Sequence, residues 1–282
     1  MPDRPDTRDH TIDDLIKGRD AKARYLSGYS KRGFAGAAGL PSKVDLADGG
    51  RFGRADYQGR VQSCTAHAVT SMAEYIFKLS TSGDKELSRL FLYKISRELL
   101  EIDGDRGCTM RETLKALHRY GCMSEVDWPY DHYHLEKLPR ITDFERARDF
   151  RSLGYARLDD YNADGERTLQ NVLRTLAEGF PVAFGFSLFS SIDSMGKGKA
   201  AIIPEPPKGE RGSDKSEDRV VGAHAVLAVG YEKRRNEGYL RIRNSWGEDW
   251  GDAGYAWLPF GYVTRQLACD FWTIYRIKAM DA

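Results

Sequence analysis

The run of residues 64–79 constrains the fold most, because it predicts a helix with a cysteine at its first position. No glycine or proline interrupts residues 65–79, and Ser63 stands just before the run as an N-cap candidate. Apolar residues recur along it at steps of three and four, at Val69, Met72, Ala73, Ile76 and Leu79. Unpaired backbone N–H groups and the helix dipole favour a thiolate at a helix start. Cys64 is therefore a candidate nucleophile, the alternative being a small buried hydrophobe, as most free cysteines are.

Two later segments favour the nucleophile. Residues 222–231 place His224 at the head of an apolar strand, and residues 238–247 end an alternating strand with Asn244 and Trp246. Cysteine, histidine and asparagine in this order, with Gln58 ahead of the cysteine, resemble the papain family of cysteine peptidases. The resemblance runs from about Leu40 to the C-terminus.

The most specific part of the resemblance is Asn244-Ser245-Trp246-Gly247, with Trp250-Gly251 and Gly254-Tyr255 behind it. The chain is most similar to a bacterial branch in which Thr-Ala-His-Ala follows the cysteine instead of an aromatic residue. Only Ser63 and Cys64 match the pattern C-G-[SA]-C-[WY] of papain and its relatives. A polar insertion also places His224 and Asn244 beyond the usual spacing of about 130–150 residues after the cysteine. These departures concern the substrate subsites more than the chemistry.

Charge and hydropathy exclude several classes of protein. Lysine and arginine number 43 and aspartate and glutamate 42, a balance that argues against a nucleic-acid-binding surface. No apolar run approaches the ~20 residues of a membrane helix, and the N-terminus lacks the apolar core of a secretory signal. We expect no membrane association, no cofactor and a cytoplasmic location. His132 and His134 are a weak hint of a metal pair, but with no cysteine or acidic partner at regular spacing we interpret them as surface residues.

The four cysteines predict no disulfide framework. The resemblance implies a bridge between the cysteine of the Gly-Cys segment and one three residues before the nucleophile, but these positions are Cys108 and Val61. Cys108 and Cys122 flank a predicted helix of ~12 residues, roughly 18 Å long. Bridged Cα atoms lie within about 7 Å, so we expect unpaired thiols and a reducing compartment.

The chain divides into an extension, residues 1–39, and a papain-like domain, residues 40–282. The pattern predicts an α+β fold with a helical lobe over about 40–149 and an antiparallel, β-rich lobe over about 150–282. Helices are expected at residues 64–79, 88–101, 109–120 and 169–178. Strands are expected at residues 153–158, 181–188, 223–231, 239–244, 255–258 and 271–277, with an exposed loop at 196–219. The site is expected in the cleft between the lobes.

The chemistry assigns a role to each site residue. His224 takes the proton of Cys64 and holds the pair as thiolate and imidazolium. Asn244 orients the imidazole through its side-chain oxygen, while Trp246 shields that bond from water or only fills the core. Gln58 is the expected oxyanion donor together with the backbone N–H of Cys64, unless it is a solvated side chain.

Other residues are weaker candidates. His67 lies one turn after Cys64 and is the rival base, although the flank of this helix is expected to pack inward. The resemblance implies that Thr109 and Met110 pair with a peptide backbone, with the Met110 side chain altering the neighbouring pocket. Gly222 and Ala223 are small residues that suit a pocket wall, and the resemblance implies a preference for an apolar residue two positions before the cleaved bond.

The leading hypothesis is a cysteine endopeptidase acting on protein or peptide substrates, made as a zymogen. Alternatives are an amidase or acyltransferase with the same Cys-His-Asn set, or an inactive binding homologue. Residues 1–39 are either a disordered tail or a short inhibitory segment. In the second case Tyr25, Leu26, Tyr29 and Phe34 would dock over the cleft.

Overall fold

The computed structural model describes residues 39–81, 83–160, 163–195, 198, 201–205, 218–234 and 237–279. Its helices are α3 (Cys64–Thr81), α4 (Arg89–Leu99), α5 (Met110–Arg119), α6 (Ile141–Ala147), α7 (Gly165–Ala177) and α8 (Gly261–Thr264). Two 3-10 turns are also present: η1 (His132–His134) lies between α5 and α6, and η2 (Ser190–Ser194) follows β3. The strands are β1 (Lys43–Asp45), β2 (Phe150–Arg157), β3 (Val182–Phe189), β4 (Val220–Arg234), β5 (Glu237–Arg243), β6 (Tyr255–Pro259) and β7 (Ala268–Ala279).

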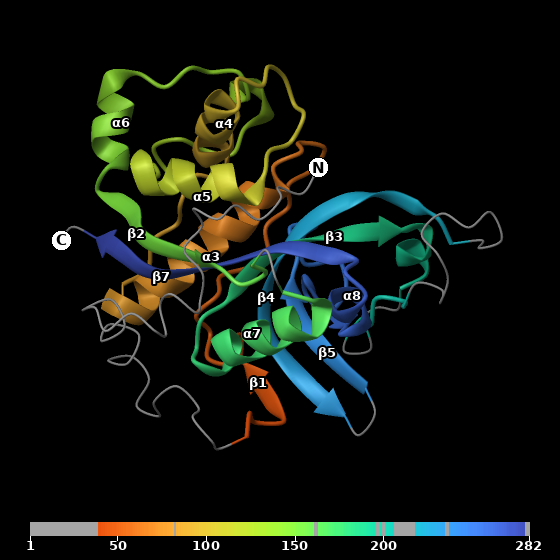
Figure 1. Ribbon diagram of the computed structural model, residues 1–282. Helices are drawn as coiled ribbons and strands as arrows, with labels where there is room; N and C mark the ends of the chain where they lie inside the picture. Colours follow the sequence, from red (N-terminus) through yellow and green to blue (C-terminus); the bar gives the residue numbers. More distant parts are fainter. Residues whose placement is uncertain are drawn as a thin grey trace.

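The strands form one antiparallel sheet in the order β2-β7-β3-β4-β5-β6, with β1 pairing to β4. Helices α3 to α6 gather on one side of the molecule, and α7 and α8 lie with the strands of the other lobe (Figure 1). The helical first half and the antiparallel, strand-rich second half confirm the predicted α+β fold.

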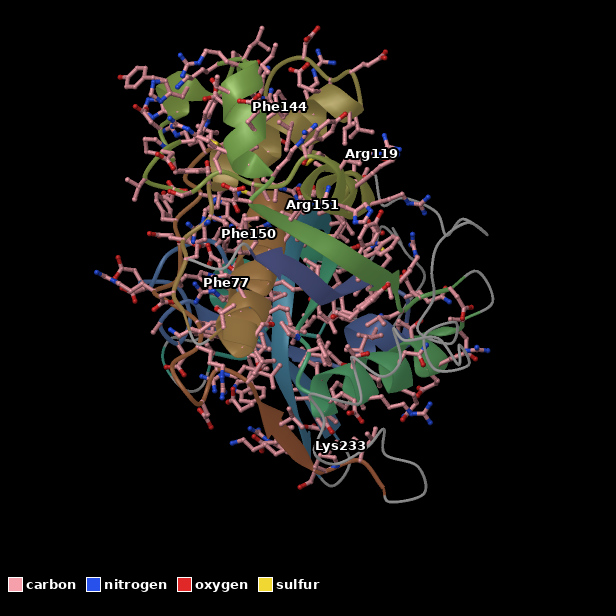
Figure 2. All side chains as sticks on the ribbon, turned by 90° about the vertical axis from the view of Figure 1, so that its left-hand side faces the viewer. Phe77, Arg119, Phe144, Phe150, Arg151 and Lys233 are labelled. Carbon is pink, nitrogen blue, oxygen red and sulfur yellow. The ribbon has the colours of Figure 1, made fainter. Side chains whose placement is uncertain are left out.

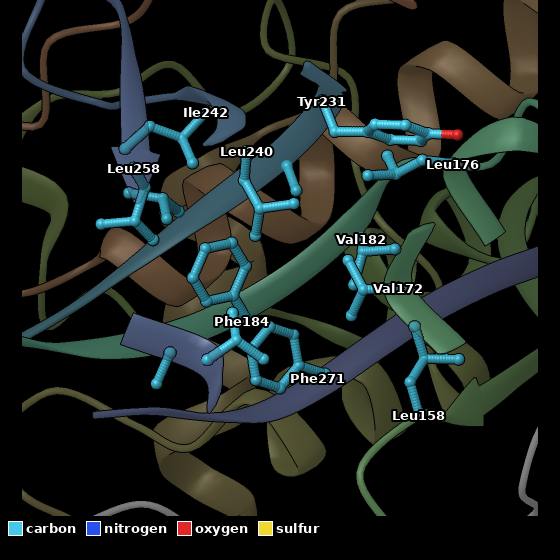
Figure 3. Packing of buried hydrophobic residues seen from close by; sticks show 14 of the residues in the cluster. Leu158, Val172, Leu176, Val182, Phe184, Tyr231, Leu240, Ile242, Leu258 and Phe271 are labelled. Carbon is cyan, nitrogen blue, oxygen red and sulfur yellow. The ribbon is translucent and has the colours of Figure 1, made fainter. Parts of the chain in front are cut away.

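Residues 225–229 of strand β4 form a continuous apolar run because both faces of the strand are buried there. Ala225, Leu227 and Val229 pack into the core of the helical lobe. Val226 and Ala228 face the other core, which is built from β3, β5, β6, β7 and α7. Figure 3 shows that second core, where Phe184 stacks on Phe271 with ring centroids 4.8 Å apart. The central sheet thus separates the two cores, and His224 lies four residues inside β4, which begins at Val220 and not at the predicted residue 223.

The helical lobe is fixed by side-chain caps and aromatic contacts. Ser88 caps α4 by accepting from the N–H of Phe91, and Thr109 caps α5 by accepting from that of Glu112. Phe77 on α3 lies against Phe150 at the start of β2, with ring centroids 5.4 Å apart (Figure 2). Helix α3 is therefore held against both the other helices and the edge of the sheet.

Several local expectations need correction. Helix α7 begins at Gly165, four residues before the predicted start, because Asp164 caps it by accepting from the N–H of Arg167. The expected exposed loop at 196–219 contains Ala201 and Ile203, which are both fully buried. Ile203 is held there by a hydrogen bond from its N–H to the carbonyl of Trp257.

The sequence did not predict α6, α8 or β1. Each is short, with seven, four and three residues, so none carries enough periodicity to be recognised. Tyr25, Leu26, Tyr29 and Phe34 lie outside the described residues, as does the rest of segment 1–38. Among the described residues, no helix is long and apolar enough to cross a bilayer.

Candidate active site

Cys64 is the first residue of α3, as the periodicity predicts. Cys64 is half-buried, and its thiol lies close to backbone N–H groups, including that of Ala225 on β4. Burial raises the pKa of the Cys64 thiol, and these N–H groups oppose the rise. The contact with Ala225 shows that α3 and β4 meet at this point, next to His224.

His224 is paired with Asn244 in the interior. Its Nε2 lies 2.6 Å from Oδ1 of Asn244, and both side chains are buried. Since an amide oxygen can only accept, His224 Nε2 carries the proton and Nδ1 is left for other partners. Burial lowers the pKa of His224 to about 4, while the hydrogen bond to Asn244 opposes that change.

Trp246 covers the imidazole of His224. The two ring centroids are 4.6 Å apart with an interplanar angle of 31°, and Trp250 packs edge-on against Trp246 at 5.4 Å. Trp246 is itself half-buried, so it contributes to the packing and also limits the access of water to one face of the imidazole.

Gln58 is held beside this group by Ser245, a residue that the sequence analysis assigned no role. Ser245 Oγ donates to Gln58 Oε1 at 2.6 Å, and the backbone N–H of Gln58 donates to the Ser245 carbonyl at 2.8 Å. Gln58 Nε2 donates one hydrogen to the Val61 carbonyl at 2.8 Å. With Oε1 occupied as an acceptor, the second Nε2 hydrogen remains for another oxygen. In the sequence, only the position of Ser245 between Asn244 and Trp246 could have indicated that this serine lies at the site.

His67 lies on the side of α3 that packs into the interior of the protein. Its Nδ1 lies 3.8 Å from Oδ2 of Asp56, which is too long for a hydrogen bond, and neither ring nitrogen bonds another described residue. It lines a small pocket of about 10 Å³, bordered also by Asp56, Arg243, Asn244 and Ser245. Burial lowers the pKa of His67, so it is neutral at neutral pH. These contacts favour His224 over His67 as the base.

Arg89 lies close to two acidic side chains next to the site, Asp56 and Glu74. Its Nη2 lies 3.0 Å from Oδ2 of Asp56 and 3.4 Å from Oε1 of Glu74. Burial alone would raise the pKa of Asp56, but the nearby His67 and Arg89 lower it to about 2. Burial raises the pKa of Glu74 to about 7 despite Arg89 and the N–H of Leu87, which donates to Glu74 at 2.7 Å.

Glu74→Gln should make stability less sensitive to rising pH. The folded protein keeps the proton of Glu74 up to about pH 7, whereas the unfolded chain releases it near the ordinary value of about 4.3. Between these limits wild-type stability falls as pH rises, and an uncharged glutamine avoids that loss. The melting temperature of the variant relative to wild type should rise by on the order of 5 °C from about pH 5 to about pH 8. An equal difference at both pH values would contradict the assignment, and Glu86→Gln, an exposed neighbour of Arg89, is the control.

The residues that were weaker candidates for substrate binding differ in their burial. Thr109 is the N-cap of α5, and the Met110 side chain is buried in the core of the helical lobe. Met110 therefore offers a peptide only its backbone at this point, and its side chain forms no surface pocket wall. Gly222 and Ala223 are exposed on β4 just before His224.

Among the described residues, the other cysteines and histidines form no further site. Cys108 and Cys122 form no disulfide, which confirms the prediction for this pair. Ser63 precedes α3, but its hydroxyl pairs with that of Tyr130 at 2.7 Å, whereas the sequence predicted a cap for the helix. In the described part of the chain, no group of three or more metal-ligating side chains comes together.

The family follows from the comparison with known proteins. Residues 40–269 match the model of the papain family of cysteine proteases. The chain belongs to this family. A peptidase C1-like protein of Acanthamoeba polyphaga mimivirus is 35% identical over 226 residues, which cover 78% of this chain and 69% of the viral protein. The chain spans 56–62% of several further curated relatives.

Two solved structures of papain-family proteins resemble the fold. Xylellain, a cysteine protease from Xylella fastidiosa, superposes with a TM-score of 0.73 and 29% identity, covering 100% of this chain and 95% of that one. The Amb a 11 cysteine protease from ragweed, in its proform, has a TM-score of 0.59 and 20% identity over 88% of this chain and 70% of that one. The first supports the two-lobed papain-like fold and the class of cysteine-type peptidases.

Proposed function

We propose that this papain-family protein is an endopeptidase in which Cys64 is the nucleophile and His224 the base. The observation that carries the proposal is the convergence of α3 and β4. The Cys64 thiol contacts the backbone of Ala225, and the adjacent His224 has its far nitrogen fixed by Asn244. Nucleophile, base and orienting group then stand in the order that acyl transfer needs.

The reaction follows in two steps. His224 Nδ1 takes the Cys64 proton, the thiolate attacks the peptide carbonyl, and the imidazolium protonates the departing amine as the C–N bond breaks. In the second step a water gives one proton to His224 and its oxygen to the acyl carbon of the resulting thioester, and the C–S bond breaks, which releases the carboxylic acid and restores the Cys64 thiolate beside the His224 imidazolium. Asn244 holds the imidazole in one orientation without adding a negative charge, so both the neutral and the charged ring are tolerated.

Burial opposes the ionisation of Cys64 alone and of His224 alone. Transfer of one proton from the thiol to the imidazole leaves the pair neutral overall. Its mutual attraction then offsets much of the desolvation cost, especially where the charges lie close together. The N–H of Ala225 at the thiol stabilises the sulfur anion further.

Gln58→Ala should lower kcat by about 10²–10³ and change KM much less. An oxyanion donor bonds the carbonyl oxygen most strongly once that oxygen is charged, so its loss appears mainly in the transition state. Steady-state kinetics on one peptide separates the two parameters. An increase in KM at unchanged kcat would remove Gln58 from the oxyanion hole.

An amidase or acyltransferase would use the same residues on other substrates. Incubating the protein with a denatured protein and, in parallel, with a panel of small amides distinguishes these functions. We expect internal cleavage of the denatured chain, detected by mass spectrometry of the fragments. Turnover of the amides alone would favour the second function, and labelling of Cys64 without any turnover would favour a binding homologue.

Deleting residues 1–38 should raise activity on peptides, mainly by lowering KM. The segment lies outside the described residues, but one related structure is a proform, and ~3.3 Å per extended residue lets 38 residues span a domain. Apolar residues within it, including Tyr25 and Phe34, would then compete with substrate. Equal kinetics for the full chain and the truncated chain would show that the segment is not inhibitory.

A further inference from the structure

Tyr57 is a large aromatic residue on the surface directly beside the site. Its side chain is 70% exposed, although Gln58, the next residue, is buried. Its loop is pinned in place: Tyr57 forms an antiparallel bridge with Trp246, and the flanking Asp56 carbonyl accepts from the N–H of Gly247 at 2.8 Å. An exposed aromatic on a fixed backbone is a feature that binding surfaces use.

The ring of Tyr57 lies over two glycines. A Cβ atom at Gly247 would lie 3.5 Å from Tyr57 Cβ and 3.6 Å from Cδ2, and one at Gly59 would lie 3.8 Å from Cε1. Both glycines have positive φ angles, +79° and +62°, which other residues adopt with strain. The glycine backbone therefore supports the ring, and its large exposed area is available for contact with another molecule.

Tyr57 stands in a row with His224 and Trp246. Trp246 packs its ring against His224 and forms an antiparallel bridge with Tyr57. Residues opposed in an antiparallel pair project to the same side of the sheet, and neighbouring strands lie about 4.8 Å apart. The Tyr57 backbone is thus about one strand spacing from that of Trp246, whose ring contacts His224.

The proposed reaction determines in which direction a bound peptide chain runs past His224, Trp246 and Tyr57. The amine released in the first step must reach His224, so the residues after the cleaved bond begin there and continue past Trp246. An extended peptide advances ~3.3 Å per residue, which brings the second residue after the bond within reach of Tyr57. The nearby charges of Asp56 and Glu248 are already paired, with Arg89 and Arg54, so an apolar side chain suits this place better than a cation.

We propose that Tyr57 is a specificity-determining residue whose ring stacks on a large apolar side chain at the second position after the cleaved bond. This inference rests on the proposed endopeptidase function. An exposed aromatic contact of this kind should favour phenylalanine over alanine at that position by about three- to tenfold in kcat/KM.

The test uses two internally quenched peptides that differ only in phenylalanine or alanine at the second position after the cleaved bond. Wild type should prefer the phenylalanine peptide, Tyr57→Ala should bring the ratio of kcat/KM close to one, and Tyr57→Phe should keep it. Tyr133→Ala, which removes another exposed tyrosine, on η1, is the control and should keep the wild-type ratio.

The outcomes separate the two proposals. If wild type cleaves neither these peptides nor a denatured protein, the endopeptidase function fails. If it cleaves both peptides at the same rate, or if Tyr57→Ala keeps the wild-type ratio, the role of Tyr57 is overturned while the function stands. A preference that Tyr57→Ala removes only at the first position after the bond would also overturn it.

Discussion

Replacing Cys64 by alanine is expected to abolish peptide hydrolysis, with a loss of roughly 10⁴-fold or more. None of the other described thiols stands at the first position of α3: Cys108 Sγ pairs with the hydroxyls of Thr65 and Thr113, Cys122 is fully buried, and Cys269 lies on β7. Burial raises the pKa of Cys108 to about 11, which keeps it a thiol at neutral pH. The activity is measured on a fluorogenic peptide with pure variant and wild type side by side.

The fold should survive this change, because Cys64 is half-buried and makes no disulfide. The control is the melting temperature of the variant, which should stay within a few degrees of wild type. Cys122→Ala, a deletion of a fully buried sulfur, should show the opposite pattern of lower stability with activity retained in the folded protein. Residual hydrolysis within about tenfold of wild type in Cys64→Ala would rule out Cys64 as the nucleophile.

Replacing His224 by alanine is expected to suppress alkylation of Cys64 at mildly acidic pH by roughly 10²-fold or more. Burial raises the pKa of Cys64, so without a proton acceptor at its side almost no thiolate exists at about pH 5. Iodoacetamide labelling rates of the folded proteins, followed across pH, measure the thiolate directly and do not depend on turnover.

His67→Ala is the matched control, since it removes the other histidine near α3's start. His67 faces Asp56 and the small pocket beside it, so its loss should leave the labelling rate of Cys64 close to that of wild type. Equal rates in the two variants would show that the base has been assigned to the wrong histidine. A drop confined to His67→Ala would make His67 the base.

The sequence predicts the site best where a single element carries the signal. Helix α3 has an unbroken apolar periodicity behind Cys64, and residues 225–229 of β4 are all apolar because this part of the strand separates two cores. The asparagine and tryptophan follow β5 within a short motif, so their proximity to His224 needs only the pairing of β4 with β5. To predict these features, one needs only the residue pattern within each element and the pairing of β4 with β5.

The parts that the sequence did not reveal depend on contacts between distant segments. Arg89 bonds Asp56, which lies 33 positions earlier, and Ser245 bonds Gln58 from 187 positions away. Neither arginine nor serine carries a pattern that names its partner, since charged and hydroxyl side chains usually face water. The burial of Ala201 and Ile203 is likewise set by a single pairing with β6 through Trp257.

The position of Tyr57 also depends on a contact between distant segments of the chain. Its exposure and its place beside His224 come from one bridge to Trp246 across most of the chain. A sequence pattern reports which residues repeat within an element, whereas this contact is fixed only when the two lobes have packed together. Specificity is therefore harder to predict from the sequence than the nucleophile.

Labelling with a thiol-reactive peptide epoxide, followed by peptide mapping, tests the central claim most directly. The reagent needs both an activated thiol and a site that accepts a peptide, so it probes the nucleophile and its surroundings together. We predict one label per chain, on Cys64, with none on Cys108, Cys122 or Cys269, and loss of the label in His224→Ala. A label spread over several cysteines, or placed on another cysteine while Cys64 stays free, would contradict the account.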